Sequence, residues 1–201
     1  MKDGVRGKRL GRSGEINFSL GKTMIFREMK LKGAYIIELE PHQDKRGFFA
    51  RSWDGNIFGE HGLSGQVIQQ NISFNKKKGT MRGMHYQAPP YQETKLVRCV
   101  RGRIFDVIVD LRPDSPTFKE WLGVELQSSI YQALYVPKDF AHGFLTLEDN
   151  TEVTYLVTEV YTPEAERGLR YNDPEIGIKW PSAVKQISEK DASWPNFSGR
   201  R

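Results

Sequence analysis

The chain has 201 residues, of which 38% are hydrophobic, 27% charged and 11% aromatic. This composition is typical of a globular protein of one or two domains, and it excludes collagen, coiled coils and a wholly disordered chain. The net charge is +5, but residues 1–30 hold eight basic and three acidic residues, and the remainder holds 22 of each. Because the bulk of the chain is neutral, we expect no nucleic-acid partner.

The first 23 residues are rich in Gly, Lys and Arg and poor in apolar positions, which predicts a flexible N-terminal extension. Residues 24–201 have the pattern of a single folded domain. No run approaches 18 apolar residues, so we expect no membrane span. With no secretory signal in the extension and one cysteine, Cys99, that has no disulfide partner, the expected compartment is the cytoplasm.

Short strand-like runs separated by turn residues follow from residue 34 onward. They cover residues 34–40, 95–100, 103–111, 121–126, 133–137, 142–147 and 151–161. Arg101 and Gly102 are typical of a hairpin turn between the second and third runs. Helical pattern is scarce, and only residues 53–61 predict a short helix. The pattern therefore predicts an all-β fold, a jelly roll whose interior can hold a small ligand.

Two of the four histidines have glycine close by, His85 in RGMHY and His142 in FAHG. Glycine in a strand indicates close approach of backbone or ligand, which favours a functional role for both. His42 and His61 lie in polar, turn-like segments and are expected on the surface.

The sequence lacks the motifs of metal-dependent, cysteine-based and nucleotide-cofactor chemistry. There is no H-x-H or H-x-x-x-H pair for a metal, and Cys99 lies in a continuous strand with nothing to activate a thiolate. The chain also lacks the glycine-rich motifs of dinucleotide folds and P-loops. The chemistry left as a candidate is proton transfer by His, Tyr, Asp and Lys side chains.

Six segments along the chain resemble the dTDP-4-dehydrorhamnose 3,5-epimerase family, which acts on nucleotide-linked 4-keto-6-deoxy sugars. They are DKRGFFARS (44–52), QQNISFNKKKGTMRGMHYQAPP (69–90), KLVRCVRGRIFDVIVDLRPDSPTFKEW (95–121), YVPKDFAHGFLTLED (135–149), TYLVTEVYTPEAERGLRYNDPEIGIKWP (154–181) and ISEKD (187–191). The resemblance implies a cupin-like jelly-roll barrel with short peripheral helices, a homodimer, and no metal or other cofactor. The implied reaction inverts C3 and C5 of dTDP-4-dehydro-6-deoxyglucose, giving dTDP-4-dehydrorhamnose for cell-surface polysaccharide.

The resemblance also implies a role for individual residues. His85 matches the catalytic base, Asp191 its partner, Tyr155 the acid on the opposite side of the sugar, and Lys95 a lysine at the sugar. The positions that match substrate-binding residues are Arg46, Gln69, Asn71, Arg82, His142, Glu166 and Lys190.

These residue types suit the implied chemistry. The C4 ketone acidifies the hydrogens on C3 and C5, so epimerisation needs a base on one face of the sugar and a proton donor on the other. Histidine, with an ordinary pKa of about 6.5, suits the base, and a carboxylate on its second nitrogen holds the correct tautomer. Tyrosine, with a pKa of about 10, stays protonated as the donor. A lysine stabilises the enolate, and Arg46 and Arg82 suit a diphosphate.

Several alternatives remain open. Asp173, in YNDPE, is a rival partner for His85, although an Asn-Asp-Pro turn explains it. Arg51 stands where the family commonly has a glutamate near the nucleotide, which leaves room for another nucleotide. The competing functions are a single-carbon (C3 or C5) epimerase of another nucleotide-linked 4-keto sugar, a non-catalytic sugar-nucleotide-binding jelly roll, and a metal-dependent cupin oxygenase.

Overall fold

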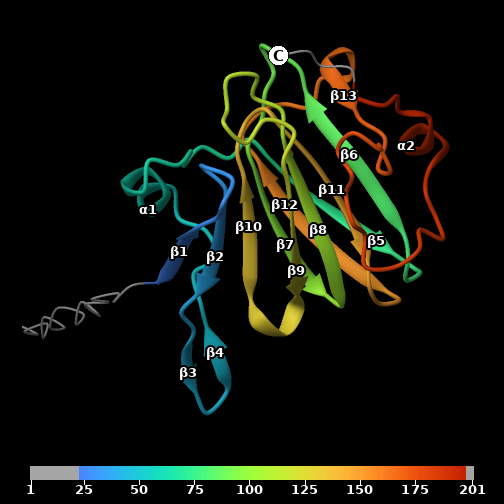
Figure 1. Cartoon of the computed structure of the whole chain (residues 1–201). Coiled ribbons are helices and arrows are strands. Elements are labelled where there is room, and N and C mark those ends of the chain that lie inside the picture. Colours follow the sequence, from blue (N-terminus) through green and yellow to red (C-terminus); the bar gives the residue numbers. More distant parts are fainter. Residues whose placement is uncertain (1–22, 198–201) are drawn as a thin grey trace, which may run out of the picture.

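The structure is a computed structural model that describes residues 23–197, and two antiparallel sheets lie face to face in it (Figure 1). The first sheet contains β1 (Met24–Glu28), β2 (Tyr35–Leu39), β10 (Gln132–Val136), β7 (Lys95–Arg101), β12 (Thr151–Val157) and β5 (Gln69–Asn75), in that spatial order. The second contains β13 (Glu166–Gly168), β6 (Met81–Gln87), β11 (Phe140–Thr146), β8 (Arg103–Asp110) and β9 (Trp121–Gln127). The predicted all-β jelly roll is confirmed.

Helices are short and peripheral, as expected. They are α1 (Gly55–Glu60), α2 (Glu189–Ser193) and the 3-10 turns η1 (Ser128–Ile130) and η2 (Pro163–Ala165). The prediction of a helix within residues 53–61 is confirmed by α1. It begins where it does because the Asp54 carboxylate caps it by accepting from the backbone N–H groups of Asn56 and Ile57.

The predicted hairpin between residues 95–100 and 103–111 is wrong. Strand β7 pairs with β10 and β12 in the first sheet, whereas β8 pairs with β11 and β9 in the second. Gly102, with φ of +77°, turns the chain from one sheet into the other. The reason is packing: Val97 and Cys99 of β7 meet Ile104 and Ile108 of β8 in the core between the sheets.

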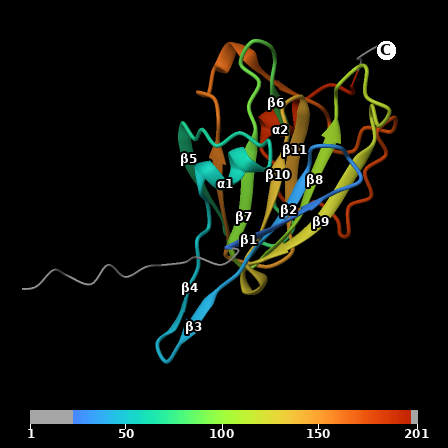
Figure 2. The same ribbon diagram turned by 90° about the vertical axis from the view of Figure 1, so that its left-hand side faces the viewer.

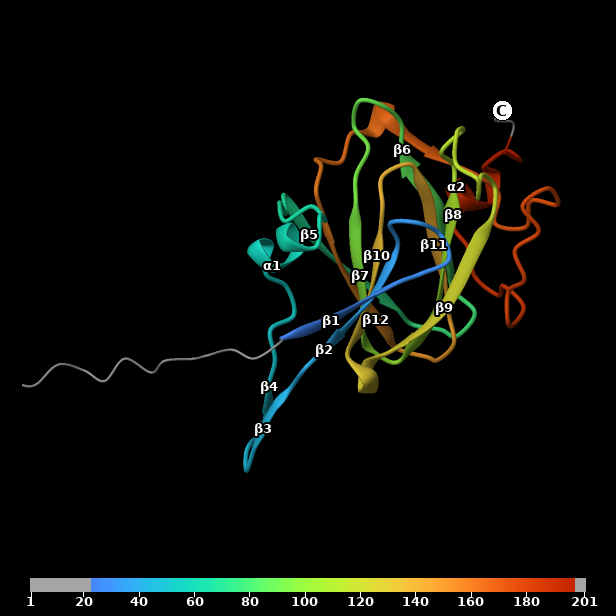
Figure 3. The ribbon, with the colours of Figure 1, turned by 60° about the vertical axis from the view of Figure 1, so that its left-hand side comes forward.

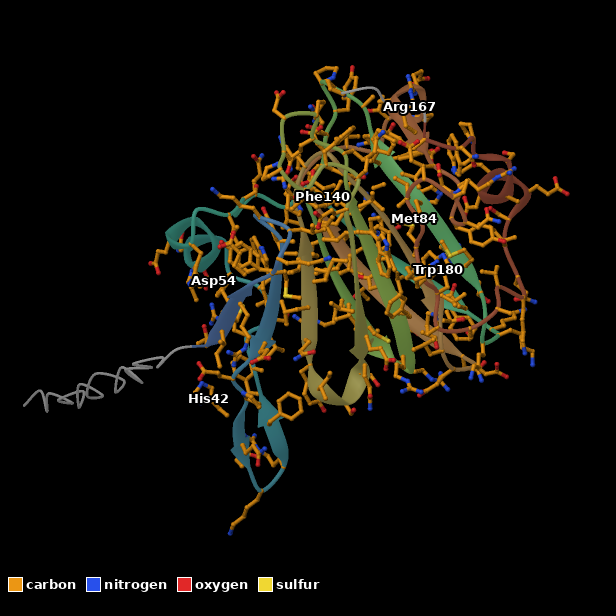
Figure 4. All side chains as sticks on the ribbon, in the orientation of Figure 1. His42, Asp54, Met84, Phe140, Arg167 and Trp180 are labelled. Atoms are coloured by element: carbon orange, nitrogen blue, oxygen red, sulfur yellow. The ribbon has the colours of Figure 1, made fainter. Side chains whose placement is uncertain are left out.

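Both outer faces of the sandwich are partly covered, as Figure 3 shows. On β8, the face opposite the inter-sheet core carries Val107 and Val109, which pack with C-terminal residues such as Leu169 and Ile176. Met84 and Trp180, labelled in Figure 4, belong to this layer. On the first sheet, Phe58 of α1 packs against Ile37 and Leu96.

A two-stranded hairpin, β3 (His42–Asp44) with β4 (Gly47–Phe49), extends away from the sandwich (Figures 1 and 2). All six of its strand residues are exposed, including His42, which the sequence places on the surface. Of the predicted extension over residues 1–23, only Thr23 lies among the described residues; it is buried and its carbonyl accepts from the Glu40 N–H. No helix among residues 23–197 is long and apolar enough to cross a membrane.

Candidate active site

A cavity of about 710 Å³ lies between the two sheets, bounded by β5 and β12 on one side and β6 and β11 on the other. Its volume lies in the range of small-molecule sites. The predicted site residues that line it are Gln69, Asn71, Arg82, His85, Lys95, His142, Tyr155, Glu166, Lys190 and Asp191. Arg46 is the single predicted site residue that the structure leaves outside.

His85 of β6 and Asp191 of α2 form the hydrogen-bonded pair that the family resemblance implies. Imidazole Nε2 donates to Asp191 Oδ1 at 2.7 Å, and Asp191 Oδ2 accepts from the Gly83 N–H at 3.2 Å. Burial alone raises the pKa of Asp191, but the hydrogen bond and attraction from His85 and the bond from Gly83 outweigh it, so this pKa is lowered. With Nε2 carrying the proton, Nδ1 is the ring nitrogen able to accept one.

A second histidine–carboxylate pair stands beside the first. His142 of β11 lies opposite His85 in the strand register, and its Nε2 donates to Asp106 Oδ1 at 2.7 Å. The close approach of β6 and β11 depends on two glycines: a Cβ on Gly83 would lie 2.6 Å from the Gly143 Cα. The glycines beside both histidines therefore mark a backbone approach, as the sequence predicts.

The opposite wall comes from the first sheet. Tyr155 of β12 is the register partner of Asn71, and Lys95 of β7 is the partner of Val157. Burial raises the pKa of Tyr155, and the negative charge of Glu93 raises it further, while Arg82 lowers it. Lys95 donates from Nζ to the Glu93 carboxylate. The cavity thus has a histidine–carboxylate pair on one sheet and a protonated tyrosine with a lysine on the other.

Three polar side chains meet at another part of the cavity wall. Lys190 Nζ donates to Glu166 Oε1 at 2.6 Å, and the Tyr161 hydroxyl donates to Glu166 Oε2 at 2.7 Å. Burial alone raises the pKa of Glu166, but the bonds from Lys190 and Tyr161 lower it overall. Gln69 is held nearby because its Oε1 accepts from the Tyr161 N–H. On β6, Arg82 Nε donates to the Asn75 Oδ1 at 2.7 Å.

Arg46, Arg51 and Asp173 lie outside the cavity. Arg46 is in the turn of the β3–β4 hairpin, where its exposed guanidinium pairs with Asp44. Arg51 pairs with Asp54, the cap of α1, at 2.8 Å. Asp173 is buried and accepts from the N–H groups of Glu175 and Phe197, so it closes a turn, and the alternative that it partners His85 is wrong.

Sequence reasoning did not single out Glu93, Tyr161 or Asp106. The spacing of Glu93 from Lys95 could have identified it. Residues two apart in an extended chain share a face, and Lys95 was already a candidate site residue. Asp106 lies on the buried inward face of β8, where an acid needs a partner. Among residues 23–197 no three His, Cys, Asp or Glu side chains gather closely enough to hold a metal ion.

The fold and cavity are those of a jelly-roll protein with a small-molecule site, and known proteins share the fold. A curated dTDP-4-dehydrorhamnose 3,5-epimerase from Methanothermobacter thermautotrophicus is 45% identical over 172 residues, covering 84% of this chain and 92% of that protein. The crystal structure of the Bacillus anthracis enzyme of that name, with TDP and PPi bound, matches with a TM-score of 0.84 and 40% identity, covering 87% and 99% of the two chains.

A Legionella pneumophila epimerase in complex with dTDP-4-keto-L-rhamnose matches with a TM-score of 0.81 and 38% identity, covering 86% of this chain and 92% of that one. The model of the dTDP-4-dehydrorhamnose 3,5-epimerase family matches residues 28–199. The chain belongs to this family, and is therefore an isomerase.

Proposed function

We propose that the chain inverts C3 and C5 of dTDP-4-dehydro-6-deoxyglucose, giving dTDP-4-dehydrorhamnose. The observation that carries the proposal is the placement of a base and an acid on opposite sheets: His85 with Asp191 on one side of the cavity, Tyr155 on the other. Epimerisation removes a proton from one face of a carbon and returns one to the other face, so it needs this opposition.

His85 Nδ1 takes the proton from a carbon next to the C4 ketone. The C–H electron pair forms a double bond from that carbon to C4, and the C=O π pair moves onto the ketone oxygen, which gives an enolate. Asp191 stabilises the imidazolium that results. Lys95 stabilises the negative enolate oxygen, an interaction stronger in the transition state than in the ground state. Tyr155 then donates its proton to the opposite face of the carbon, the ketone re-forms, and the imidazolium proton returns through solvent to the phenolate.

The remaining predicted residues bind substrate. Arg82 and Lys190 supply the positive charge that a diphosphate requires. Gln69, Asn71, His142 and Glu166 line the cavity with donors and acceptors for the sugar and nucleotide. The proposed reaction requires no metal or other cofactor, and the proposed compartment is the cytoplasm.

We also propose a homodimer. The edge strand β5, at the rim of the cavity, exposes Ile72 and Phe74, 67% and 47% exposed, and the projecting hairpin exposes Phe48 and Phe49. Exposed apolar surface of this kind marks an interaction site. A second copy of the chain would cover this apolar surface. It would also explain why Arg46 lies outside its own cavity: Arg46 binds the diphosphate in the cavity of the other copy.

The test is incubation with dTDP-4-dehydro-6-deoxyglucose in D₂O, with deuterium at C3 and C5 followed by NMR and mass spectrometry. Exchange at both carbons together with inverted product supports the proposal. Exchange at one carbon assigns a single-carbon epimerase instead. Binding without any exchange overturns catalysis and favours a sugar-nucleotide-binding protein. His85→Ala is the control for background exchange.

A further inference from the structure

Glu93 is a mostly buried acid in the cavity wall, and it takes no part in the proposed proton transfer. It lies two residues before Lys95, and its carboxylate accepts from the Lys95 ammonium. The two side chains are 12% and 11% exposed, and both line the cavity. Both side chains therefore lie on the cavity side of the chain.

The residue between them anchors the pair to the wall. The Thr94 N–H donates to Thr158 Oγ1 at 2.9 Å, and the two threonine hydroxyls are 3.1 Å apart. Thr158 directly follows β12, the strand that carries Tyr155. The Glu93–Lys95 pair is therefore held against the same strand as the proposed acid.

Stability alone gives no reason to keep such a pair. A buried ion pair contributes little net stability compared with apolar side chains of the same volume, because both charges lose water. Removing one partner is costly, since it leaves the other charge buried and alone. An ammonium has three donors, so the bond to Glu93 fixes its direction and leaves two donors for the cavity.

Glu93 differs from the other charged groups around Tyr155 in its effect on the pKa of the tyrosine. The neighbouring strand β5 presents only uncharged residues to the cavity, namely Gln69, Asn71, Ile72, Ser73 and Phe74, and β7 presents Lys95. The charged or titratable groups elsewhere in the cavity wall are Arg82, His85 and Tyr86 of β6, His142 of β11, Tyr161, Glu166 of β13, and Lys190 and Asp191 of α2. After burial, Glu93 is the strongest contributor to the raised pKa of Tyr155, and Arg82 opposes it.

We propose that Glu93 is a positioning residue, which fixes the Lys95 ammonium in the cavity wall and keeps a negative charge beside Tyr155. The proposal rests on the proposed function, in which Lys95 meets the enolate oxygen and Tyr155 donates a proton. Glu93 acts through these two residues and does not itself touch the reacting carbons.

The geometric part is tested by kinetics of Glu93→Ala and Glu93→Gln. Glu93→Ala leaves Lys95 without its acceptor, and we expect kcat to fall about 10²-fold with KM changed by less than about threefold. Glu93→Gln keeps an acceptor oxygen, and we expect it to recover kcat to within about tenfold of the wild type. Glu125→Gln on β9, where Glu125 pairs with Arg103 outside the cavity, is the matched control. A kcat of Glu93→Ala equal to or above that of the wild type overturns the proposal.

The electrostatic part is tested without turnover. The titration of Tyr155 is followed by NMR of ring-labelled tyrosine, with the signal assigned by its loss in Tyr155→Phe. Because both Glu93 variants remove the charge, we expect each to move the Tyr155 midpoint to lower pH by about one unit, and Glu125→Gln to leave it in place. An unmoved midpoint in Glu93→Gln overturns the proposal. This titration tests the effect of Glu93 on Tyr155 even if the wild type is inactive on the proposed substrate. Inactivity of the wild type would overturn only the proposed function.

Discussion

Asp191 of α2 and His85 of β6 are 106 residues apart in the chain, yet a 2.7 Å hydrogen bond joins Oδ1 to Nε2. The C-terminal segment makes this possible by folding back over the outer face of the second sheet and forming the short helix α2, which lies against β6. The side chain of Ser188 accepts from the Asp191 N–H and fixes the start of that helix. The proposed base thus depends on a segment remote from its own strand.

Asp191→Asn is expected to reduce kcat about 10³-fold, because an amide cannot stabilise the imidazolium and can favour the wrong tautomer. The measurement is turnover together with deuterium exchange at C3 and C5, and both should fall. Asp173→Asn is the matched control: it should lower the melting temperature through its lost turn, with kcat unchanged. Equal kcat values for Asp191→Asn and the wild type would remove Asp191 from the mechanism.

The same carboxylate makes a pH-dependent contribution to stability. The folded pKa of Asp191 is lowered below its ordinary value, so the folded state favours the ionised form. This contribution is present above about pH 4 and is lost as pH falls through the folded pKa. Urea unfolding should therefore show a larger stability difference between wild type and Asp191→Asn at pH 7 than at pH 2. An equal stability difference between the two proteins at pH 7 and at pH 2 would contradict this pH dependence.

Tyr155→Phe separates proton removal from proton return. The ring keeps its packing but loses the donor, so we expect deuterium exchange at the carbon that His85 reaches to persist while inverted product falls at least about 10²-fold. NMR of the product and mass spectrometry of the recovered substrate distinguish the two. Tyr171→Phe, on the far side of the second sheet, is the control. Wild-type levels of inverted product would exclude Tyr155 as the acid.

Arg46 provides a test of the proposed dimer. Arg46→Ala should weaken substrate binding and His85→Ala should abolish turnover, but co-expressed chains form mixed dimers in which one cavity has both residues intact. We expect activity at low substrate concentration to return to about one quarter of the wild type, since half of the dimers then hold one complete cavity of two.

Co-expressed His85→Ala and Tyr155→Phe chains are the control for that experiment. Both changes act within the cavity of the chain that carries them, so no mixed dimer has a complete site. Recovery in this control, or none with Arg46→Ala, would show that Arg46 does not serve the other copy. Size-exclusion chromatography with light scattering measures the dimer directly.

Local patterns in the amino-acid sequence predicted the fold class and many of the residues that line the cavity. Alternating short strands and turn residues indicated the all-β sandwich, the glycines beside His85 and His142 indicated a close backbone approach, and the resemblance to a family named ten residues that line one cavity. These features are local: strand period, turn chemistry and short motifs are carried by neighbouring residues.

Strand pairing and the partner of His85 depend on contacts between segments far apart in the chain, so the sequence pattern left them unresolved. Arg101 and Gly102 have the composition of a hairpin turn, but Gly102 joins two different sheets, because Val97 and Ile104 are buried together between them. Sequence left Asp173 and Asp191 as rivals for His85. The path of the C-terminal segment brings Asp191 to β6 and commits Asp173 to a turn. Arg46 lies in a segment that matches the family, yet the β3–β4 hairpin places it outside its own cavity. The reason is that strand pairing and burial depend on the whole chain and not on local composition.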